Sequence, residues 1–539
     1  MLKDWKIKGA DPSSVSVKVI SMPNRIDFEV DAAEGAEVQR LSLIVEFTET
    51  LISWRNHDYT WVDTSRKRLA AYYSPKAAVF KSGTKVVASR TDGLWLFDPR
   101  RPRSIEWVLE HEDLAPLFDY QEDDSSAFRE PVRALDKPLR LTFLLTKGAI
   151  PEFSRSRLPF SAILCFTDHC DFDSLPLLMA QRKLFAKHGI RVTKGVFLYH
   201  YSKRDFNTSL ERNADEYELW TADGHELCYH SLSQSTRATD EEWEKDFEDF
   251  AVDGRSWQTW IDHGFQPYNF TTHKRSGIDA DLWAEMMSRA GIRYLWNYLD
   301  CGNAGPGMIN QADPDTFTFG AYRRRCFSKP SAKAFMDLFR SYILFFGSEK
   351  DQMLYRKLTF FIKIKGWKYG LEGAWGLIRS ILYLAKQGVK LLMTRKDAVP
   401  HWQRFTPLFF RERIGGKDFT FFQTLEVHDF IQSFSETNVR QLCDKAGVCL
   451  AHTYFADLDK RKEGRIFVNG EGALIPGIDE VFERIAAAST EGKLWIATLA
   501  EVGERFDSFR HLVYDIDEKG NIFHRLEKEV QDLHLRYIN

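Results

Sequence analysis

The 539-residue sequence predicts an α/β fold built from two parts. The first part is β-rich, because residues 15–150 contain short runs of Val, Ile, Leu and Phe separated by turn residues. The second part, from about residue 154, alternates strand-like and helix-like segments at the spacing of a parallel sheet or barrel. A helical, basic and aromatic block at residues 329–414 interrupts this alternation. We therefore expect domains at residues 1–153 and 154–539, with the block inserted into the second.

The N-terminal domain is expected to be an antiparallel, sandwich-like structure. Runs such as SVSVKVI, IDFEV and RLSLIVEF lie among turn signals that include Pro-Asn and Thr-Asp-Gly. Short strands at this spacing favour two packed antiparallel sheets. Nothing in this region suggests catalysis. Its expected role is to pack against the second domain or, alternatively, to bind a glycan.

Composition excludes several classes of protein. The formal net charge is -3, so no overall positive field indicates a nucleic-acid partner. The seven cysteines show no CxxC spacing, which favours a reducing compartment over a disulfide framework or a structural zinc site. No apolar run reaches the roughly 18 residues of a membrane-spanning helix, and the first residues lack the apolar segment of a signal peptide. These features predict a cytoplasmic protein.

Polar side chains follow the first strand of the predicted barrel. The apolar run SAILCFT leads directly into Asp168, His169 and Asp171. An amphipathic helix then ends at Gly189, and the strand-like run VTKGVFLYH follows it. Because barrel sites form at the C-terminal ends of the strands, these polar groups are expected to face the barrel mouth. A solvated loop after a strand is the alternative interpretation.

Two histidines bracket the next candidate strand. In the segment GHELCYHSLSQ, His225 and His230 lie five positions apart and Gln234 follows. A carboxylate and imidazoles from separate strand ends form the ligand set of a divalent metal with an open position for water. Such a metal makes water nucleophilic near neutral pH, and a second carboxylate can accept the proton. A structural histidine pair is the alternative.

The order of these motifs resembles the polysaccharide deacetylase family, also described as NodB-homology proteins or carbohydrate esterase family four. That family has a strand ending in an aspartate pair, a GHE segment with metal histidines, an F-R-x-P-x-G loop, a strand ending in Asp and a late L-x-H strand. This sequence has, in the same order, ILCFTDHCDFD, GHELCYHSLSQ, GFQPYNF, AGIRYLWNYLD and AGVCLAHTYF. The resemblance runs from about Pro159 to about Phe506 and implies a deacetylase-type (β/α) barrel.

The resemblance implies site roles only where the residues match. Asp168 matches the aspartate that serves the family as general base. His452 matches the late histidine that acts as general acid, and His230 matches the first metal histidine. The metal-binding aspartate has no clean match, because ungapped alignment places His169 there and Asp171 is the nearest carboxylate.

Two departures from the family pattern affect the implied site. Gln234 stands where the second metal histidine is expected, so metal affinity should fall or another ligand must substitute. The candidate substitutes are His200, His225 and His273. Gln266 replaces the arginine that orients the base, whereas Asp300 is retained. Gln266, Tyr268 and Asp300 are the residues expected on the substrate side.

The implied function is metal-dependent hydrolysis of an N-acyl group, above all N-acetyl, on an amino sugar or a lipid-linked glycan. The implied cofactor is a divalent metal, zinc first, with cobalt, nickel and manganese as alternatives. The second hypothesis is a catalytically degenerate barrel that binds a glycan or a lipid-linked glycan. Metal content separates the two hypotheses, because only the enzyme requires a tightly held ion.

The inserted block differs in charge from the rest of the chain. From Lys329 to Trp402 it has 14 lysines and arginines against 5 acidic residues. Its notable aromatic and basic residues are Trp367, Tyr369, Trp375, Lys386 and Lys390. Apolar and cationic side chains on one segment are typical of helices that lie on anionic membranes. We expect either a peripheral helix at the inner face of the membrane or a helical cap packed over the barrel.

Overall fold

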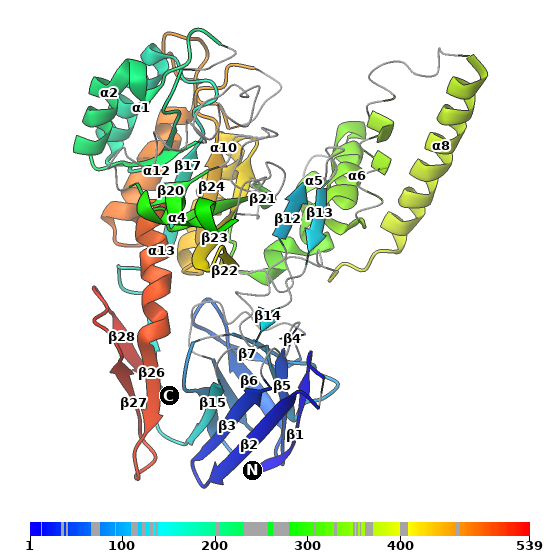
Figure 1. Cartoon of the computed structure of the whole chain (residues 1–539), viewed down its shortest axis with the longest axis vertical. Helices are drawn as coiled ribbons and strands as arrows, with labels where there is room; N and C mark the ends of the chain where they lie inside the picture. The colour runs from blue at the N-terminus through cyan, green and yellow to red at the C-terminus, as the bar shows by residue number, and fades with distance from the viewer. Residues whose placement is uncertain are drawn as a thin grey trace.

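The computed structural model describes most of the chain. The segments outside the described residues are 12, 34–36, 39–40, 66–75, 92, 109–116, 121–125, 130–132, 135–137, 201–203, 231–256, 262–279, 305–308, 328–330, 349–350, 352–353, 356, 360, 362–369, 399–407 and 460–463. Figure 1 shows the N-terminal strands in blue at one end and the barrel at the other. The helices of the insertion lie to one side of both.

The N-terminal domain is built on two larger antiparallel sheets, in agreement with the predicted sandwich-like arrangement. It also has two short antiparallel pairs, β4 (Glu37–Val38) with β14 (Arg133–Ala134) and β12 (Leu117–Tyr120) with β13 (Ser126–Arg129). The first sheet contains β1 (Leu2–Lys8), β5 (Ser42–Phe47), β11 (Ser104–Val108) and β10 (Leu94–Leu96) in that order. The second contains β2 (Val15–Met22), β3 (Arg25–Ala32), β15 (Leu139–Thr146), β9 (Lys85–Ala88), β8 (Ala77–Phe80), β6 (Leu51–Arg55) and β7 (Trp61–Asp63).

Aromatic packing holds the two sheets together. The ring of Phe143 on β15 lies 5.9 Å from Phe28 in its own sheet and 5.9 Å from Phe47 and 5.3 Å from Trp107 in the other. All four side chains are buried. Aromatic side chains bury large apolar areas, so this cluster accounts for much of the stability of the sandwich.

The second domain is a closed barrel of parallel strands. Its strand order is β17 (Ala162–Asp168), β18 (Thr193–Val196), β19 (Glu226–Tyr229), β20 (Thr259–Trp260), β21 (Tyr294–Ala304), β23 (Lys417–Val427) and β24 (Val448–Thr453), and β24 returns to β17. Every residue of β17 is buried, which is why this strand reads as a continuous apolar run. The predicted α/β barrel is therefore present.

Helices and two further strands complete the second domain. The helices are α1 (Leu175–His188), α2 (Leu210–Ala222), α4 (Ala280–Arg289), α10 (Phe430–Ser433), α11 (Glu436–Asp444), α12 (Ile478–Thr490) and α13 (Leu499–Ser508). β25 (Leu494–Ile496) pairs in parallel with the first residues of β17, whose pairing with β18 begins only at Thr167. β22 (Phe409–Ile414) pairs with β23 in the antiparallel sense. Residues 409–414 were expected to be part of the helical insertion. That expectation was wrong, because FFRERI forms a ladder with the following strand.

Glu226, from the GHE segment, lies at the N-terminal ends of the barrel strands. Its carboxylate accepts hydrogen bonds from Thr193 Oγ1 at 2.7 Å, Thr259 Oγ1 at 2.6 Å and the Ala500 backbone nitrogen at 3.0 Å. A buried carboxylate needs such donors, because burial without them is costly. Glu226 therefore ties together the end of the barrel that is opposite to the mouth.

The C-terminal residues return to the junction between the domains. β16 (Ile150–Phe153) pairs with β28 (Leu535–Ile538), and β26 (Leu512–Ile516) forms a hairpin with β27 (Ile522–Leu526). Buried Arg155 joins the parts, since its Nη2 donates to the backbone oxygens of His57 at 2.5 Å and Ala446 at 2.7 Å. The N-terminal domain is thus fastened to the barrel by a buried cation.

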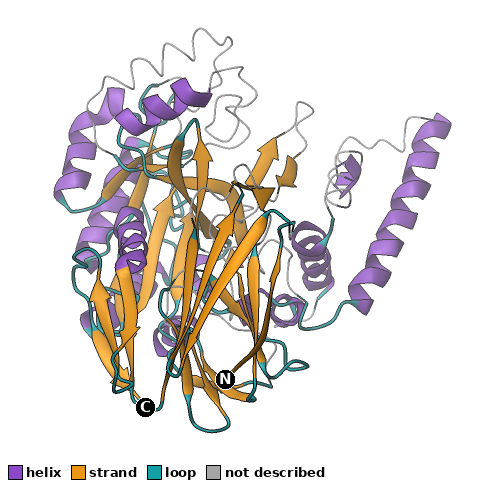
Figure 2. Cartoon of the chain, turned by 60° about the horizontal axis from the view of Figure 1, so that its bottom comes forward, coloured by secondary structure: helices purple, strands orange, loops and turns teal. Residues whose placement is uncertain are grey.

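The insertion is helical over most of its described length. It follows η3 (Pro314–Phe317) and α5 (Phe319–Cys326) and contains α6 (Ala332–Phe346) and the long helix α8 (Gly370–Met393). Buried residues of α5, α6 and α8 form a small separate core that includes Tyr322, Ile343 and Leu391. In Figures 1 and 2, α8 stands away from the barrel. Within the described residues, no helix is long and apolar enough to cross a membrane.

Candidate metal centre

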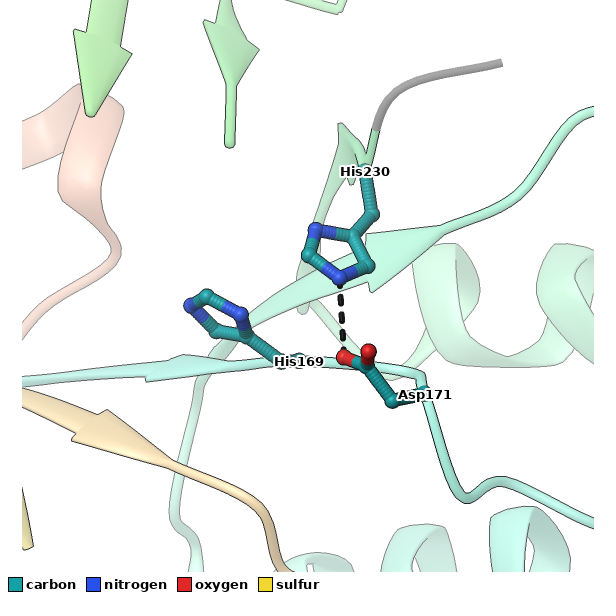
Figure 3. Close-up of side chains that lie close together, drawn as sticks. All are labelled: His169, Asp171 and His230. Carbon is teal, nitrogen blue, oxygen red and sulfur yellow. Dashed lines mark hydrogen bonds and ion pairs between the residues drawn. The ribbon is translucent and has the colours of Figure 1, made fainter. Parts of the chain in front are cut away.

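Three side chains with metal-ligating atoms meet at the mouth of the barrel. His169 and Asp171 follow β17, and His230 follows β19; both strands flank β18. One ligand atom from each of the three lies within 4.8 Å of the others. Figure 3 shows the two imidazoles and the carboxylate pointing toward one another. The two histidines are buried and Asp171 is partly exposed.

The hydrogen bonds of His230 orient its ring for ligation. Its Nδ1 lies 3.0 Å from the backbone oxygen of Ile261, and a carbonyl oxygen can only accept, so Nδ1 carries the proton. In the neutral ring Nε2 then presents a lone pair, and it lies 2.9 Å from Asp171 Oδ2 (Figure 3). The lone pairs of His230 Nε2 and Asp171 Oδ2 repel each other at this distance unless a proton or a cation lies between the two atoms. Orientation of a ligating histidine by a backbone carbonyl is common in metal sites.

The donor set fits a divalent metal of the zinc class. Two imidazole nitrogens and one carboxylate oxygen form a three-residue set that leaves further coordination positions open. The expected alternatives for the metal-binding carboxylate position, His169 and Asp171, are both at the cluster. His230 is the third member. The backbone of His169 is fixed by a 3.0 Å hydrogen bond from its nitrogen to the Thr453 oxygen.

An aspartate–histidine pair lies beside the cluster. His452 on β24 places Nδ1 at 3.0 Å from Asp300 Oδ2 on β21. Thr424 on β23 donates to Asp300 Oδ1 at 2.6 Å, and Trp296 Nε1 donates to Thr424 at 2.9 Å. Burial disfavours the charged imidazole, but the negative charge and hydrogen bond of Asp300 outweigh it and raise the pKa of His452.

The pair and the cluster form one site. The imidazole of His452 stacks on that of His169, with ring centroids 3.9 Å apart and planes inclined by 18°. The indole of Trp296 meets His169 at 5.2 Å and His452 at 5.1 Å, both edge to face. Nε2 of His452 is buried and makes no hydrogen bond to any described group. A buried polar atom in this state indicates a missing partner such as a substrate or solvent.

Asp168 occupies a different environment from the one expected of a general base. Its side chain is fully buried and forms an ion pair with Lys194 of β18. Oδ1 accepts hydrogen bonds from Thr453 Oγ1 at 3.0 Å and the Phe455 backbone nitrogen at 2.9 Å, while Oδ2 faces Lys194. Both oxygens are therefore engaged within the fold.

Lys194 is the centre of a buried polar network behind the site. Its ammonium lies 2.6 Å from Asp173 Oδ2 and 3.1 Å from Gln181 Oε1, in addition to its contact with Asp168. Burial opposes its charge, yet the two carboxylates raise the pKa of Lys194. A paired buried cation of this kind holds the strands that carry it in register, because losing either partner exposes an uncompensated charge.

Two of the three candidate substitute ligands, His225 and His200, do not join the cluster among the described residues. His225 accepts a hydrogen bond from the Val192 nitrogen at 3.2 Å and packs against Phe185 and Trp220, and burial lowers its pKa to about 4. His225, one of the three possible substitutes, therefore lies apart from the cluster. His200 is also absent from the group of described ligands that meet at the mouth. Four expected residues lie outside the described part of the chain: Gln234, Gln266, Tyr268 and His273.

Several residues at the site were not identified from the sequence. Lys194 is a charged residue in a strand that is mostly apolar. This pattern could have identified it, because a buried lysine needs an anionic partner. Trp296, Thr424 and Tyr454 gave no such signal. The rings of Trp296 and Tyr454 and the hydroxyl of Thr424 contact residues from strands that are distant in the sequence. Strand β23, which carries Thr424, was not predicted.

Comparisons with known proteins add little to this description. No protein-family model matches the chain, and no curated protein matches it. Two structures of the GH31 dextranase FjDex31A of Flavobacterium johnsoniae, complexed with isomaltotriose and with glucose, are similar at 11% and 12% identity and a TM-score of 0.21. Each alignment covers 54% of this chain and 39% of the dextranase. A similarity of this extent carries no functional conclusion.

Proposed function

We propose that this chain is a metal-dependent hydrolase that removes an N-acyl group, above all N-acetyl, from an amino sugar or a lipid-linked glycan. The observation that carries the proposal is the meeting of two chemically different groups at one barrel mouth. His169, Asp171 and His230 supply a set of metal ligands. His452, oriented by Asp300, supplies a proton-transferring imidazole in ring contact with the cluster. The motif order of the deacetylase family supports the choice of an amide substrate.

Within the proposal, His169, Asp171 and His230 hold the metal. A bound divalent ion of the zinc class lowers the pKa of water and polarises a carbonyl oxygen. The residues themselves prepare the site, since the Ile261 carbonyl fixes the tautomer of His230 and the Thr453 carbonyl fixes the backbone of His169. The ligand geometry is therefore largely set before any ion binds.

The Asp300–His452 pair moves the proton. In amide hydrolysis water loses a proton as its oxygen bonds to the carbonyl carbon, the carbon–nitrogen bond breaks, and the departing nitrogen gains a proton, so one group that first accepts and then donates a proton balances the reaction. Asp300 holds Nδ1 of His452, so the proton is delivered from Nε2, the buried atom that makes no hydrogen bond to described groups. Thr424 and Trp296 hold Asp300 in place and limit its rotation.

Aromatic side chains near the cluster suit a carbohydrate. Tyr454 lies 4.9 Å from the ring of His452, and Phe172 lies 5.8 Å from Tyr454. Both rings are only partly buried. A partly exposed aromatic surface beside polar groups offers an apolar face for a sugar ring and leaves the hydroxyls to solvent or polar partners. This supports a sugar substrate over a purely aliphatic amide.

Asp168 receives a positioning role in the proposal. The resemblance assigned it to proton abstraction, but its carboxylate is engaged by Lys194, Thr453 and Phe455. By fixing the end of β17, it sets the direction in which the adjacent His169 leaves the strand. The proton-transferring imidazole nearest the ligand cluster is then His452.

The engagement of Asp168 also favours a second hypothesis. A barrel whose family base is paired with a buried lysine has lost one element of the family mechanism. Such a barrel could retain the carbohydrate surface and act as a glycan-binding module. This hypothesis differs from the first because it requires neither a metal nor turnover.

The test is hydrolysis by the full-length protein. N-acetylated amino sugars and their lipid-linked forms are incubated with the enzyme, and acetate release is measured before chelation, after chelation and after zinc is restored. The proposal expects release that chelation abolishes and zinc restores. Saturable glycan binding without acetate release from any of these substrates would replace the enzyme with the binding module.

A further inference from the structure

Helix α8 exposes an apolar face to solvent. Trp375 is 63% exposed, Leu382 is 65% exposed and Leu392 is 80% exposed. Ile378, Ile381 and Val389 are exposed as well. Single exposed apolar residues are common on protein surfaces, but a contiguous group of large ones marks an interaction site.

The exposed residues occupy one side of the helix. At about 100° per residue, the six side chains fall within an arc of about 120°. This arc is wider than the narrow seam of a two-helix coiled coil. The exposed cations Arg379 and Lys386 fall within about 40° of one border of this arc, and Lys390, next to them, pairs with Asp351 Oδ2 at 3.1 Å. The helix therefore presents a broad apolar face with basic residues along one edge.

The opposite side of α8 is fixed to the rest of the insertion. The hydroxyl of Tyr383 donates to the Asp351 backbone oxygen at 2.6 Å, and Gln387 Nε2 donates to Asp351 Oδ1 at 2.5 Å. One turn further, Leu391 is buried in the core shared with α5 and α6. These contacts hold the apolar face outward, and in Figure 1 α8 forms the outermost element of the insertion.

We propose that this outer face of α8 binds an anionic lipid surface. The apolar arc would enter the boundary between headgroups and acyl chains, while the basic border would lie against negative headgroups. Since none of the described helices could cross a membrane, the helix lies in the plane of the surface. The proposal is independent of the chemistry at the barrel mouth.

Charge favours a lipid surface over a second copy of the chain. From Trp375 to Met393 the sequence of α8 contains no acidic residue. Two copies packed antiparallel through this face would place Arg379 and Lys386 against the same cations of the partner copy. Parallel packing would place Arg379 and Lys386 against the apolar border of α8 in the partner copy. An anionic lipid surface can contact Arg379 and Lys386 at the same time. Each of these cations increases the affinity for such a surface roughly fivefold.

The experiment is co-sedimentation of the full-length protein with vesicles. One set consists of phosphatidylcholine alone, and in the other about a third of the lipid is phosphatidylserine, so that the surface is negative. The variants are the double change Ile378→Glu with Leu382→Glu, and the double change Arg379→Glu with Lys386→Glu. Ile20→Glu on β2, an exposed apolar residue of the other domain, is the matched control.

We expect binding to the phosphatidylserine vesicles only, weakened at least about tenfold by either double change and unaffected by the control. High salt should also reduce it, because the Debye length falls to about 3 Å at 1 M. Equal sedimentation of all variants overturns the proposal, as does the absence of sedimentation. A concentration-dependent dimer that the α8 changes disrupt, in protein that ignores vesicles, would assign the face to a second copy instead.

Discussion

At the scale of single residues, neighbouring side chains have different tasks. His169 and Asp171 contribute to the ligand cluster, whereas Asp168, one position earlier, is buried with Lys194. Strand alternation explains the difference, because successive side chains at the end of β17 point to opposite faces. The residue that best matches the family base therefore points into a polar network of the fold.

A pair of isosteric variants tests these assignments. Asp168→Asn leaves Lys194 with one carboxylate in place of two, so we expect a loss of about 3 kcal/mol in the free energy of unfolding. Asp300→Asn should leave stability nearly unchanged and lower turnover by about 10² to 10⁴, because His452 loses its orienting partner. Denaturation and acetate release measure the two effects. An Asp168→Asn protein that is as stable as the wild type and inactive would restore Asp168 as the base.

His225 predicts a dependence of stability on pH. Its pKa is lowered to about 4 in the fold, because of burial, from the ordinary value of 6.5. Below pH 6.5 His225 is protonated in the unfolded chain, whereas in the folded chain it stays neutral until the pH falls to about 4. Stability is therefore lost as pH falls through this window, by about 1.4 kcal/mol per unit.

The variant His225→Phe removes this titration. Between pH 6.5 and pH 5 it should lose about 2 kcal/mol less stability than the wild type, although it starts from a lower value because Val192 loses its acceptor. Urea denaturation at the two pH values gives the comparison. Identical acid sensitivity in the two proteins would show that His225 titrates normally in the fold.

At the scale of elements, strand periodicity and the positions of polar residues predicted the barrel and its functional end. The candidate residues His169 and His230 were singled out because they follow or bracket apolar strands, and His452 because it matches the late histidine of the deacetylase family. The short strand β20 and the alternating β22–β23 hairpin were missed. Two residues of β20 carry almost no pattern, and the hairpin follows directly on a helical block.

Gly195 shows how one strand shapes the site. A Cβ at this position of β18 would lie 3.1 Å from the backbone oxygen of Asp168 and 3.2 Å from the Cβ of His230. A Gly195→Val variant should therefore displace His230 and weaken metal binding by about 10- to 100-fold, the usual effect of disturbing the support of a ligand. Calorimetric zinc titration measures it. Gly388→Ala, where a Cβ meets open space, is the control and should bind zinc normally.

At the scale of the whole molecule, the chain combines three parts: the sandwich, the barrel and the insertion. The N-terminal sandwich is fastened to the barrel by Arg155, and the insertion extends from between β21 and β22. The sequence predicted the sandwich and the barrel from strand patterns. The sequence did not predict whether the apolar face of α8 is buried or exposed, because the amphipathic pattern of a helix is the same in both cases.

The most direct test of the central claim is zinc titration of the metal-free, full-length protein by calorimetry. We predict one site per chain, lost in His230→Ala and in Asp171→Asn and retained in Asp300→Asn, which alters only the neighbouring proton-transferring pair. Wild-type protein that binds no zinc, cobalt, nickel or manganese, or that binds equally well after both ligand changes, would contradict the metal centre and with it the proposed hydrolase.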